Sequence, residues 1–442
     1  MSLLNRLQQV GSRLDAGALY QSFGTLVRVN GMVLTVAGGQ YTLGQRYQVE
    51  MQDGQWVEAE VVGFDREQAF LMPLTNASAL TTGARVRPQV NAAALTVSRA
   101  LLGRVLDGLM QPLDGGPVLT KGEHISSQLA AVNPMQKKGV STPLDVGIKA
   151  INGLFTVGQG QRLGLFAGSG VGKSKLLGMM TRFTSADVVI VGLVGERGWE
   201  VKDFIEHSLG PEGMKKAIVV AAPADQSPLL RMRSAELAHR LAAWFRDQGL
   251  HVLLLVDSLT RYAQAQREIA LSVGEPPATR GYPPSVFSKL TQLVERAGNS
   301  SDSNGSMTAI YTVLAEGDDQ QDPIADAARA ILDGHVVLSR ELAERGHYPA
   351  IDIGASISRV MPNIVSEQQL KSCYSLKRLY SRYQQVQELI PLGAYQAGKD
   401  SELDRAVALY PKIEQFLCQG LHEQVDFSQT EQQLATLVAQ HA

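Results

Sequence analysis

The hydrophobic positions of the chain change their period twice along its length. Between residues 24 and 74 apolar and polar side chains alternate with a period of two, which is typical of half-buried strands. The alternation occurs in five runs, residues 25–29, 32–36, 46–50, 56–62 and 69–74. Turn-forming pairs, such as Asn30-Gly31 and Asp53-Gly54, separate these runs. Five or six short strands that close on themselves predict a small β-barrel.

Continuous apolar runs replace the alternation in the middle of the chain. They are residues 163–166, 188–194, 217–222, 252–256 and 308–314. Strands that helices cover on both faces have this composition, because neither face meets water. Amphipathic stretches such as residues 234–247 and 286–297 lie between the runs. The alternation predicts an α/β core with a parallel sheet.

A helical period marks both ends of the chain. After about residue 367 it runs through residues 370–390, 403–409 and 413–417, which predicts an α-helical C-terminal domain. At the start, Leu3, Leu7, Val10 and Leu14 fall on one face of a short amphipathic helix. That face either docks on its own domain or binds a partner.

These changes of period set the predicted domains. Residues 1–92 form the N-terminal helix and β-barrel, residues 93–364 the α/β core, and residues 365–442 the helical domain.

A glycine-rich turn follows the run at residues 163–166 and leads into a helical pattern. It consists of Ala167, Gly168, Ser169, Gly170, Val171, Gly172, Lys173 and Ser174. Small residues let successive backbone N–H groups close on a phosphate, to which the new helix also presents its positive end. Lys173 can reach the β and γ oxygens and Ser174 can hold Mg²⁺. The turn therefore predicts a nucleotide-binding loop, with Ala167 in place of the usual first glycine.

Two further strand ends carry charged residues. Asp257 ends the run at 252–256, where such a carboxylate either orders a Mg²⁺ shell or caps a helix. Glu196 and Arg197 follow the run at 188–194. Glu196 is a candidate for orienting a water against the γ-phosphate, and the alternative is a surface salt bridge with Arg197. Arg197 and Arg261 either neutralise phosphate charge or tether a helix.

Composition narrows the class of protein. The chain has 442 residues with 41 basic and 43 acidic side chains, so its formal charge of −2 gives no general attraction to nucleic acid. Its two cysteines are too few for a disulfide framework. No apolar run is long enough to span a membrane. We expect a cytoplasmic protein with at most a peripheral association with a membrane.

Several longer motifs together resemble the export ATPases of type III secretion, which are relatives of the rotary ATP synthase catalytic subunits. They are residues 167–174, 195–198, 257–263, 274–287, 316–319, 322–326 and 331–340. Residues 350–353 and 355–361 are more similar to the flagellar branch of this family than to the injectisome branch. Trp199 is a departure, since relatives more often have Arg there.

The resemblance implies a fold and a set of roles. The fold is a RecA-like P-loop ATPase core with an N-terminal β-barrel and a C-terminal α-helical domain. Lys173 would bind the phosphates of ATP, Ser174 and Asp257 would bind Mg²⁺, and Glu196 would activate water. Arg197 and Arg261 would lie beside the γ-phosphate.

Two roles rest on the resemblance alone: Arg359 as an arginine finger for a neighbouring subunit and Tyr348 as a contact for adenine.

The resemblance also implies partners. In a closed ring of identical subunits, every site receives an arginine finger from a neighbouring subunit. We therefore expect a homohexamer. A stator-like regulator would bind the N-terminal helix, and a coiled-coil stalk would enter the pore lined by residues 274–284. Export chaperones would dock on the C-terminal helices, and the assembly would meet a membrane export gate. The implied function is Mg²⁺-dependent ATP hydrolysis that energises flagellar protein export, by releasing chaperones and unfolding cargo.

Other functions remain as alternatives. The nearest is an ATPase of an injectisome. A hexameric nucleic-acid motor of the transcription-terminator type would need aromatic and basic residues interleaved on the barrel strands. The barrel region has only Tyr41, Tyr47, Trp56, Phe64 and Phe70 among charges of both signs, so no nucleic-acid partner is expected. A subunit of a proton-pumping rotary ATPase would need a different partner subunit to supply the finger.

Overall fold

The structure is a computed structural model that describes residues 23–75, 77, 79–89, 94–126, 135, 137–314, 322–393 and 395–439. Two compact units make up the chain: Met1–Ala94 with Glu268–Pro276, and Leu95–Arg267 with Pro277–Ala442. The predicted N-terminal helix and the motif at residues 316–319 lie outside the described residues. Within the described part, no helix is both long and apolar enough to cross a membrane.

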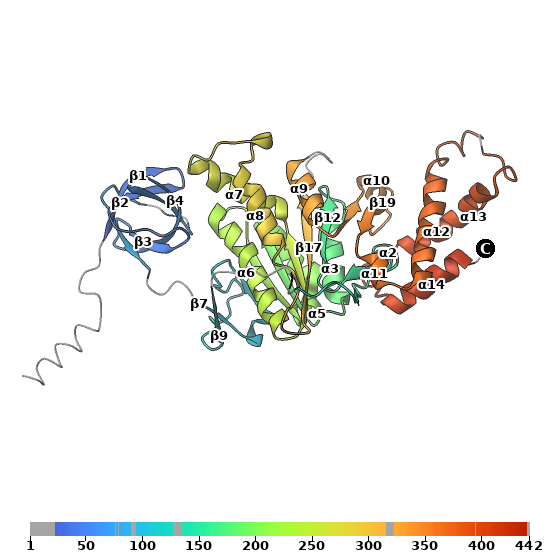
Figure 1. Ribbon diagram of the computed structural model, residues 1–442, viewed down its shortest axis with the longest axis horizontal. Helices are drawn as coiled ribbons and strands as arrows, with labels where there is room; N and C mark the ends of the chain where they lie inside the picture. The colour runs from blue at the N-terminus through green and yellow to red at the C-terminus, as the bar shows by residue number, and fades with distance from the viewer. Residues whose placement is uncertain are drawn as a thin grey trace, which may run out of the picture. The chain divides into compact units, whose positions relative to one another are not determined.

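The first unit contains a closed barrel of six antiparallel strands, drawn in blue in Figure 1. The strands are β1 (Gly24–Asn30), β2 (Val33–Ala37), β3 (Arg46–Glu50), β4 (Trp56–Asp65), β5 (Gln68–Pro73) and β6 (Arg85–Pro88), in the order β1-β2-β5-β4-β3-β6. Inward residues such as Leu26, Val49 and Leu71 are fully buried. This confirms the predicted barrel, and β6 supplies the strand that closes it.

The second unit is built on a nine-stranded sheet. Its order is β19-β18-β12-β17-β15-β13-β14-β8, with β16 paired to β17. The bounds are β8 (Val105–Leu106), β12 (Arg162–Ala167), β13 (Val188–Val194), β14 (Ala217–Ala222), β15 (His251–Asp257), β16 (Gly298–Asn299), β17 (Ser306–Leu314), β18 (Gly334–Leu338) and β19 (Ile351–Ser358). All five predicted apolar runs are strands in its parallel centre, which confirms the α/β core.

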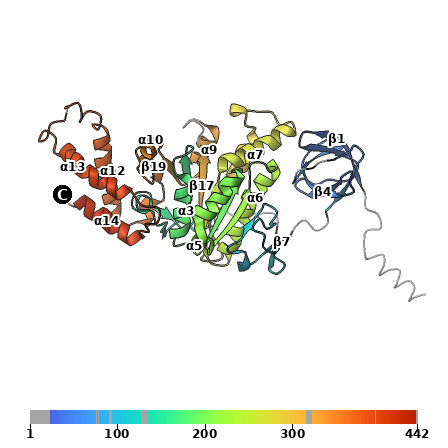
Figure 2. The ribbon, with the colours of Figure 1, turned by 180° about the vertical axis from the view of Figure 1, so that it is seen from behind.

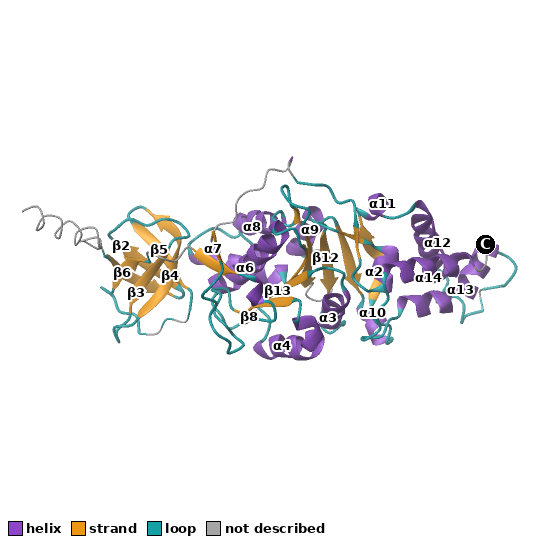
Figure 3. Cartoon of the chain, turned by 90° about the horizontal axis from the view of Figure 1, so that it is seen from below, coloured by secondary structure: helices purple, strands orange, loops and turns teal. Residues whose placement is uncertain are grey.

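Helices cover both faces of this sheet. Figure 3 shows α6 (Pro228–Asp247), α8 (Pro284–Val294) and α9 (Pro323–Ile331) on one face, and α3 (Lys173–Phe183) and α4 (Gly198–Asp203) on the other. Helix α6 starts earlier than its periodicity predicts, because the Ser227 hydroxyl accepts a hydrogen bond from the Leu230 amide and Pro228 fits the first turn. The remaining helices of this region are α2 (Lys149–Leu154), α5 (Gly210–Met214), α7 (Leu259–Ser272) and α10 (Arg340–Glu344).

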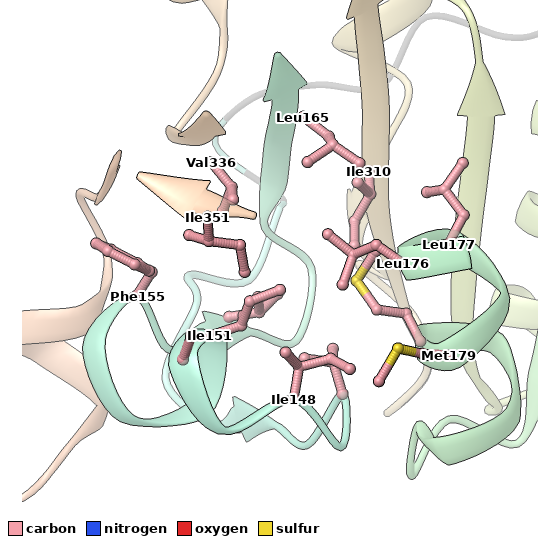
Figure 4. Packing of buried hydrophobic residues seen from close by; sticks show 14 of the residues in the cluster. Ile148, Ile151, Phe155, Leu165, Leu176, Leu177, Met179, Ile310, Val336 and Ile351 are labelled. Carbon is pink, nitrogen blue, oxygen red and sulfur yellow. The ribbon is translucent and has the colours of Figure 1, made fainter. Parts of the chain in front are cut away.

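One contiguous apolar cluster lies beneath α3, and we call it the α3 core (Figure 4). Leu176, Leu177 and Met179 of α3 pack there against side chains of β12, β17, β18 and β19. Residues of α2 also belong to the cluster. Because β12 and α3, which join at the phosphate loop, both pack in this core, the same packing fixes the position of the loop.

The C-terminal region is a bundle of helices, seen from behind in Figure 2. It contains α11 (Met361–Ile364), α12 (Glu367–Gln384), α13 (Ser401–Leu417) and α14 (Phe427–Ala439). Helices α12, α13 and α14 pack on one another and on α2. The predicted helical end of the chain is confirmed, with three differences: α12 ends at Gln384 and not at residue 390, the two short periods merge into α13, and α14 was not predicted.

Candidate active site

The phosphate loop joins β12 to α3. Gly170 has φ +80° and Gly172 has φ +91°, a left-handed conformation that favours glycine. Gly172 is the residue before the first turn of α3, so Lys173 and Ser174 open the helix. The first backbone N–H groups of a helix have no intrahelical acceptor and can bind an anion.

A cavity of about 600 Å³ opens over this loop. Its lining comprises Ala167, Gly168, Ser169, Gly170, Gly172, Lys173, Ser174, Lys175, Gly195, Glu196, Arg197, Glu200, Ala224, Thr260, Arg261, Gln264, Leu314 and Arg340. Most of the predicted site residues are therefore brought together here. Val171 is the exception within the loop, because its side chain is buried in the α3 core.

Lys173 stands at the centre of a buried charged cluster. Its Nζ lies 2.6 Å from Asp257 Oδ1 and 3.4 Å from Glu196 Oε1. Three elements converge to make it, since Lys173 starts α3, Asp257 ends β15 and Glu196 follows β13. Burial disfavours the charged ammonium, but the two carboxylates outweigh burial and raise the pKa of Lys173 above its ordinary value. Lys173 is therefore a cation.

The pKa of the Glu196 carboxyl group is raised to about 7. Burial is the largest cause, the negative charge of Asp257 acts in the same direction, and the positive charge of Lys173 acts against both. Glu200 on α4 also raises the pKa of Glu196 through a hydrogen bond. A carboxyl group with a pKa near neutrality can exchange a proton at working pH, as a general base must.

The two predicted arginines differ in their surroundings. Arg261 packs on Gly195, where an added Cβ would lie 3.1 Å from Arg261 Cβ. Its Nη1 donates to Gln264 Oε1 at 3.0 Å, and its Nε is buried without a hydrogen-bond partner among the described residues. Arg197 lines the cavity with an exposed side chain. Trp199, in the first turn of α4, is 65% exposed.

Tyr348 and Arg359 do not line the cavity, although the structure gives each a definite place. The ring of Tyr348 lies against the phosphate loop, since a Cβ on Gly172 would be 3.4 Å from Tyr348 Cε1. Its carbonyl accepts a hydrogen bond of 2.9 Å from the Gln419 amide. Arg359 follows β19 with an exposed side chain, and its Nη2 donates to the Arg329 carbonyl at 3.3 Å.

The side chains available for a metal ion are few. Among the described residues, no three His, Cys, Asp or Glu side chains cluster in a way that could hold one. The Ser174 hydroxyl, in the first turn of α3, and the Asp257 carboxylate, at the end of β15, are hard oxygen ligands. Mg²⁺ typically takes one or two protein oxygens and completes its shell with water and substrate phosphates. The donor set therefore fits Mg²⁺ bound together with a nucleotide.

Sequence reasoning missed several residues of the site. Arg340, Gln264 and Thr260 line the cavity, and the hydroxyl of Thr312 donates to Asp257 Oδ1 at 2.6 Å. Arg340 lay within a quoted motif without a role. Thr312 gave no signal of its own, because only the sheet order places it beside Asp257.

Comparison with known proteins identifies the family. The nucleotide-binding domain model of the ATP synthase alpha/beta family matches residues 147–358, and the β-barrel domain model of that family matches residues 26–89. A C-terminal domain model described for the T3SS EscN ATPase matches residues 365–436. A flagellum-specific ATP synthase of Pseudomonas aeruginosa is 56% identical over 94% of this chain and 93% of that protein. The chain belongs to the family of flagellum-specific ATP synthases and type III secretion ATPases.

Other relatives and solved structures agree. A flagellum-specific ATP synthase of Salmonella typhimurium is also 56% identical, over 93% of this chain and 92% of that protein. A type 3 secretion system ATPase of Xanthomonas euvesicatoria is 45% identical over 91% of each chain. The assembled ATPase EscN of enteropathogenic E. coli is 40% identical with a TM-score of 0.88, covering 94% of this chain and all of EscN. The family recognised from the motifs is confirmed, and the chain is a P-loop ATPase.

Proposed function

We propose that this ATPase hydrolyses Mg·ATP to energise flagellar protein export. The observation that carries the proposal is the charged cluster at the phosphate loop, in which Lys173 lies 2.6 Å from Asp257 and 3.4 Å from Glu196. Without nucleotide, the two carboxylates neutralise the ammonium. When phosphates enter, Lys173 can turn to them, and Glu196 is left beyond the γ-phosphate with a pKa suited to accept a proton from water.

The other groups of the cavity would stabilise the transferring phosphoryl group. Arg197 and Arg261 can neutralise charge on the γ-phosphate from the side of β13 and α7. The ring of Tyr348 beside Gly172 is placed to cover the adenine. Ser174 and Asp257 would hold Mg²⁺, which would offset the negative charge of the phosphates.

Arg359 would act on a neighbouring subunit. Its exposed side chain lies outside the cavity of its own chain. An arginine finger raises phosphoryl-transfer rates by roughly 10³–10⁵. EscN has been solved in an assembled form and in complex with a central stalk, EscO, and both structures cover 94% of this chain. We infer a homohexamer with a coiled-coil stalk in its pore.

The remaining partners in this proposal are those that the family resemblance implies. The Pseudomonas and Salmonella relatives at 56% identity are both flagellum-specific ATP synthases, which favours a flagellar apparatus over an injectisome. The Xanthomonas protein is 45% identical, as are other flagellum-specific ATP synthases. In this proposal the ring works in the cytoplasm at a membrane export gate. A stator-like regulator binds the N-terminal helix, and chaperones dock on α12 to α14.

The test is Mg²⁺-ATPase activity per mole of chain over a wide range of protein concentration. Three proteins are compared: wild type, Glu196→Gln and Arg359→Ala. We expect specific activity to rise with concentration, both variants to be inactive alone, and a mixture of the two to recover activity. Recovery is expected because Glu196→Gln subunits keep the finger and Arg359→Ala subunits keep the base.

Activity that is flat with concentration and survives loss of Arg359 would contradict the ring mechanism. A wild-type protein without ATPase activity at any concentration would contradict the proposed function itself. Secretion of flagellar subunits by a strain carrying Glu196→Gln then tests the role in export.

A further inference from the structure

Two donors meet on one oxygen of the buried Asp257 carboxylate. The ammonium of Lys173 and the hydroxyl of Thr312 each lie 2.6 Å from Asp257 Oδ1. Asp257 is 3% exposed, so solvent contributes little to the stability of its charge. The carboxylate therefore depends on these two donors.

The two donors differ in freedom of movement. Lys173 carries its charge on a flexible four-carbon stem at the edge of a cavity. Thr312 is fully buried in β17, which lies between β12 and β15 in the sheet. Its β-branched side chain has few rotamers, and its alternative acceptor, the Val256 carbonyl, is more distant at 3.4 Å. The hydroxyl is thus held against the carboxylate by the sheet.

We propose that Thr312 is a positioning residue for Asp257, and that it holds this carboxylate in its orientation when Lys173 moves to the phosphates. This inference rests on the proposed function. The Thr312 hydroxyl stays on Oδ1 during this movement, so Asp257 keeps the orientation in which it would serve as a metal ligand. Without the hydroxyl, departure of Lys173 would leave this buried carboxylate without a hydrogen-bond donor among the described residues, a state that costs free energy.

The experiment compares ADP binding with and without Mg²⁺ by titration calorimetry on the full chain. Thr312→Val removes the hydroxyl and keeps the shape, and Thr312→Ser keeps the hydroxyl. Thr181→Val is the matched control, because Thr181 is equally buried but its hydroxyl donates to the Leu177 carbonyl within α3.

We expect Thr312→Val to weaken Mg·ADP binding by roughly tenfold or more, as loss of a hydrogen bond to a charged group does. Binding of ADP in EDTA should change less than threefold, and Thr312→Ser and Thr181→Val should bind Mg·ADP like the wild type. Equal losses with and without Mg²⁺, or no loss, would overturn the inference.

The two proposals fail separately. A wild-type chain whose ADP affinity does not respond to Mg²⁺ contradicts the proposed function. A normal Mg²⁺ response in wild type that Thr312→Val retains contradicts only the role of Thr312. Far-ultraviolet circular dichroism of each variant checks folding.

Discussion

The α3 core and the charged cluster above it are made by the same elements, yet they are stabilised in opposite ways. Beneath α3, Leu176 and Leu177 pack among apolar side chains. Each of these contacts stabilises the fold regardless of the charges nearby. One turn earlier, Lys173 is stable only because Asp257 and Glu196 compensate its charge. The stability of the core therefore depends on side-chain volume, and that of the cluster depends on the balance of its charges.

Loss of the Lys173 charge should have the largest effect on function. Lys173→Ala leaves Asp257 and Glu196 as neighbouring buried carboxylates and removes the cation for the phosphates. We expect kcat to fall by on the order of 10²–10³ or more, as for other groups that stabilise a transition state. Steady-state ATPase assays measure this. Lys215→Ala, which removes an exposed lysine paired with Glu212, is the control and should keep full activity.

The equivalent truncation in the α3 core should be large for stability. Leu177→Ala removes a fully buried side chain and leaves a cavity between α3 and the sheet. We expect a loss of about 2–5 kcal/mol in the free energy of unfolding, measured by urea denaturation. Leu392→Ala, at a side chain that is 78% exposed, should stay within about 0.5 kcal/mol of wild type. Similar losses at both sites would mean that Leu177 does not stabilise the protein through its burial in the α3 core.

The strands and the site residues were predicted from the sequence to different extents. Apolar runs identified the five central strands, because strands covered on both faces must be apolar throughout. The edge strand β19 and its neighbour β18 were not predicted as strands, since half-buried or exposed positions interrupt their apolar patterns. The motif residues were predicted with their chemistry, but their grouping depends on sheet order.

Thr312 shows why the rest could not be predicted. It lies 55 residues from Asp257 in the chain and meets it only because β17 inserts between β12 and β15. The alternation of strands and helices in a sequence fixes neither the order of strands in a sheet nor their register. Local patterns therefore carry the elements, and long-range packing determines which side chains meet.

The pH dependence of hydrolysis should report the cluster directly. The pKa of Glu196 is raised to about 7, so below pH 7 its carboxyl group is protonated and cannot accept a proton from water. We expect kcat/KM to fall about tenfold per pH unit on the acid side of pH 7. A pH–rate profile in constant ionic strength checks this. A rate that stays level from pH 7 to pH 5 would show that Glu196 is not the base.

The smallest expected effect is a gain in stability, opposite in sign to the loss expected for Leu177→Ala. The folded-state pKa of Glu196 is about 7, above its ordinary value of 4.5, so folding favours its protonated form. The stability that protonation contributes is complete below pH 4.5 and is lost as pH rises through 7. The glutamine of Glu196→Gln does not titrate. We therefore expect the free energy of unfolding of this variant, relative to wild type, to rise by on the order of 1–3 kcal/mol from pH 4.5 to pH 8.

Urea denaturation at both pH values measures this gain, with Glu212→Gln as the control at an exposed carboxylate. If the variant differs from wild type by the same free energy at both pH values, Lys173 fully compensates the charge of ionised Glu196. That result would contradict the upward shift of the Glu196 pKa. A gain confined to the higher pH would show that the cluster keeps its charge at a cost in stability. Leu177→Ala changes no ionisable group, so its loss of stability should show no such dependence.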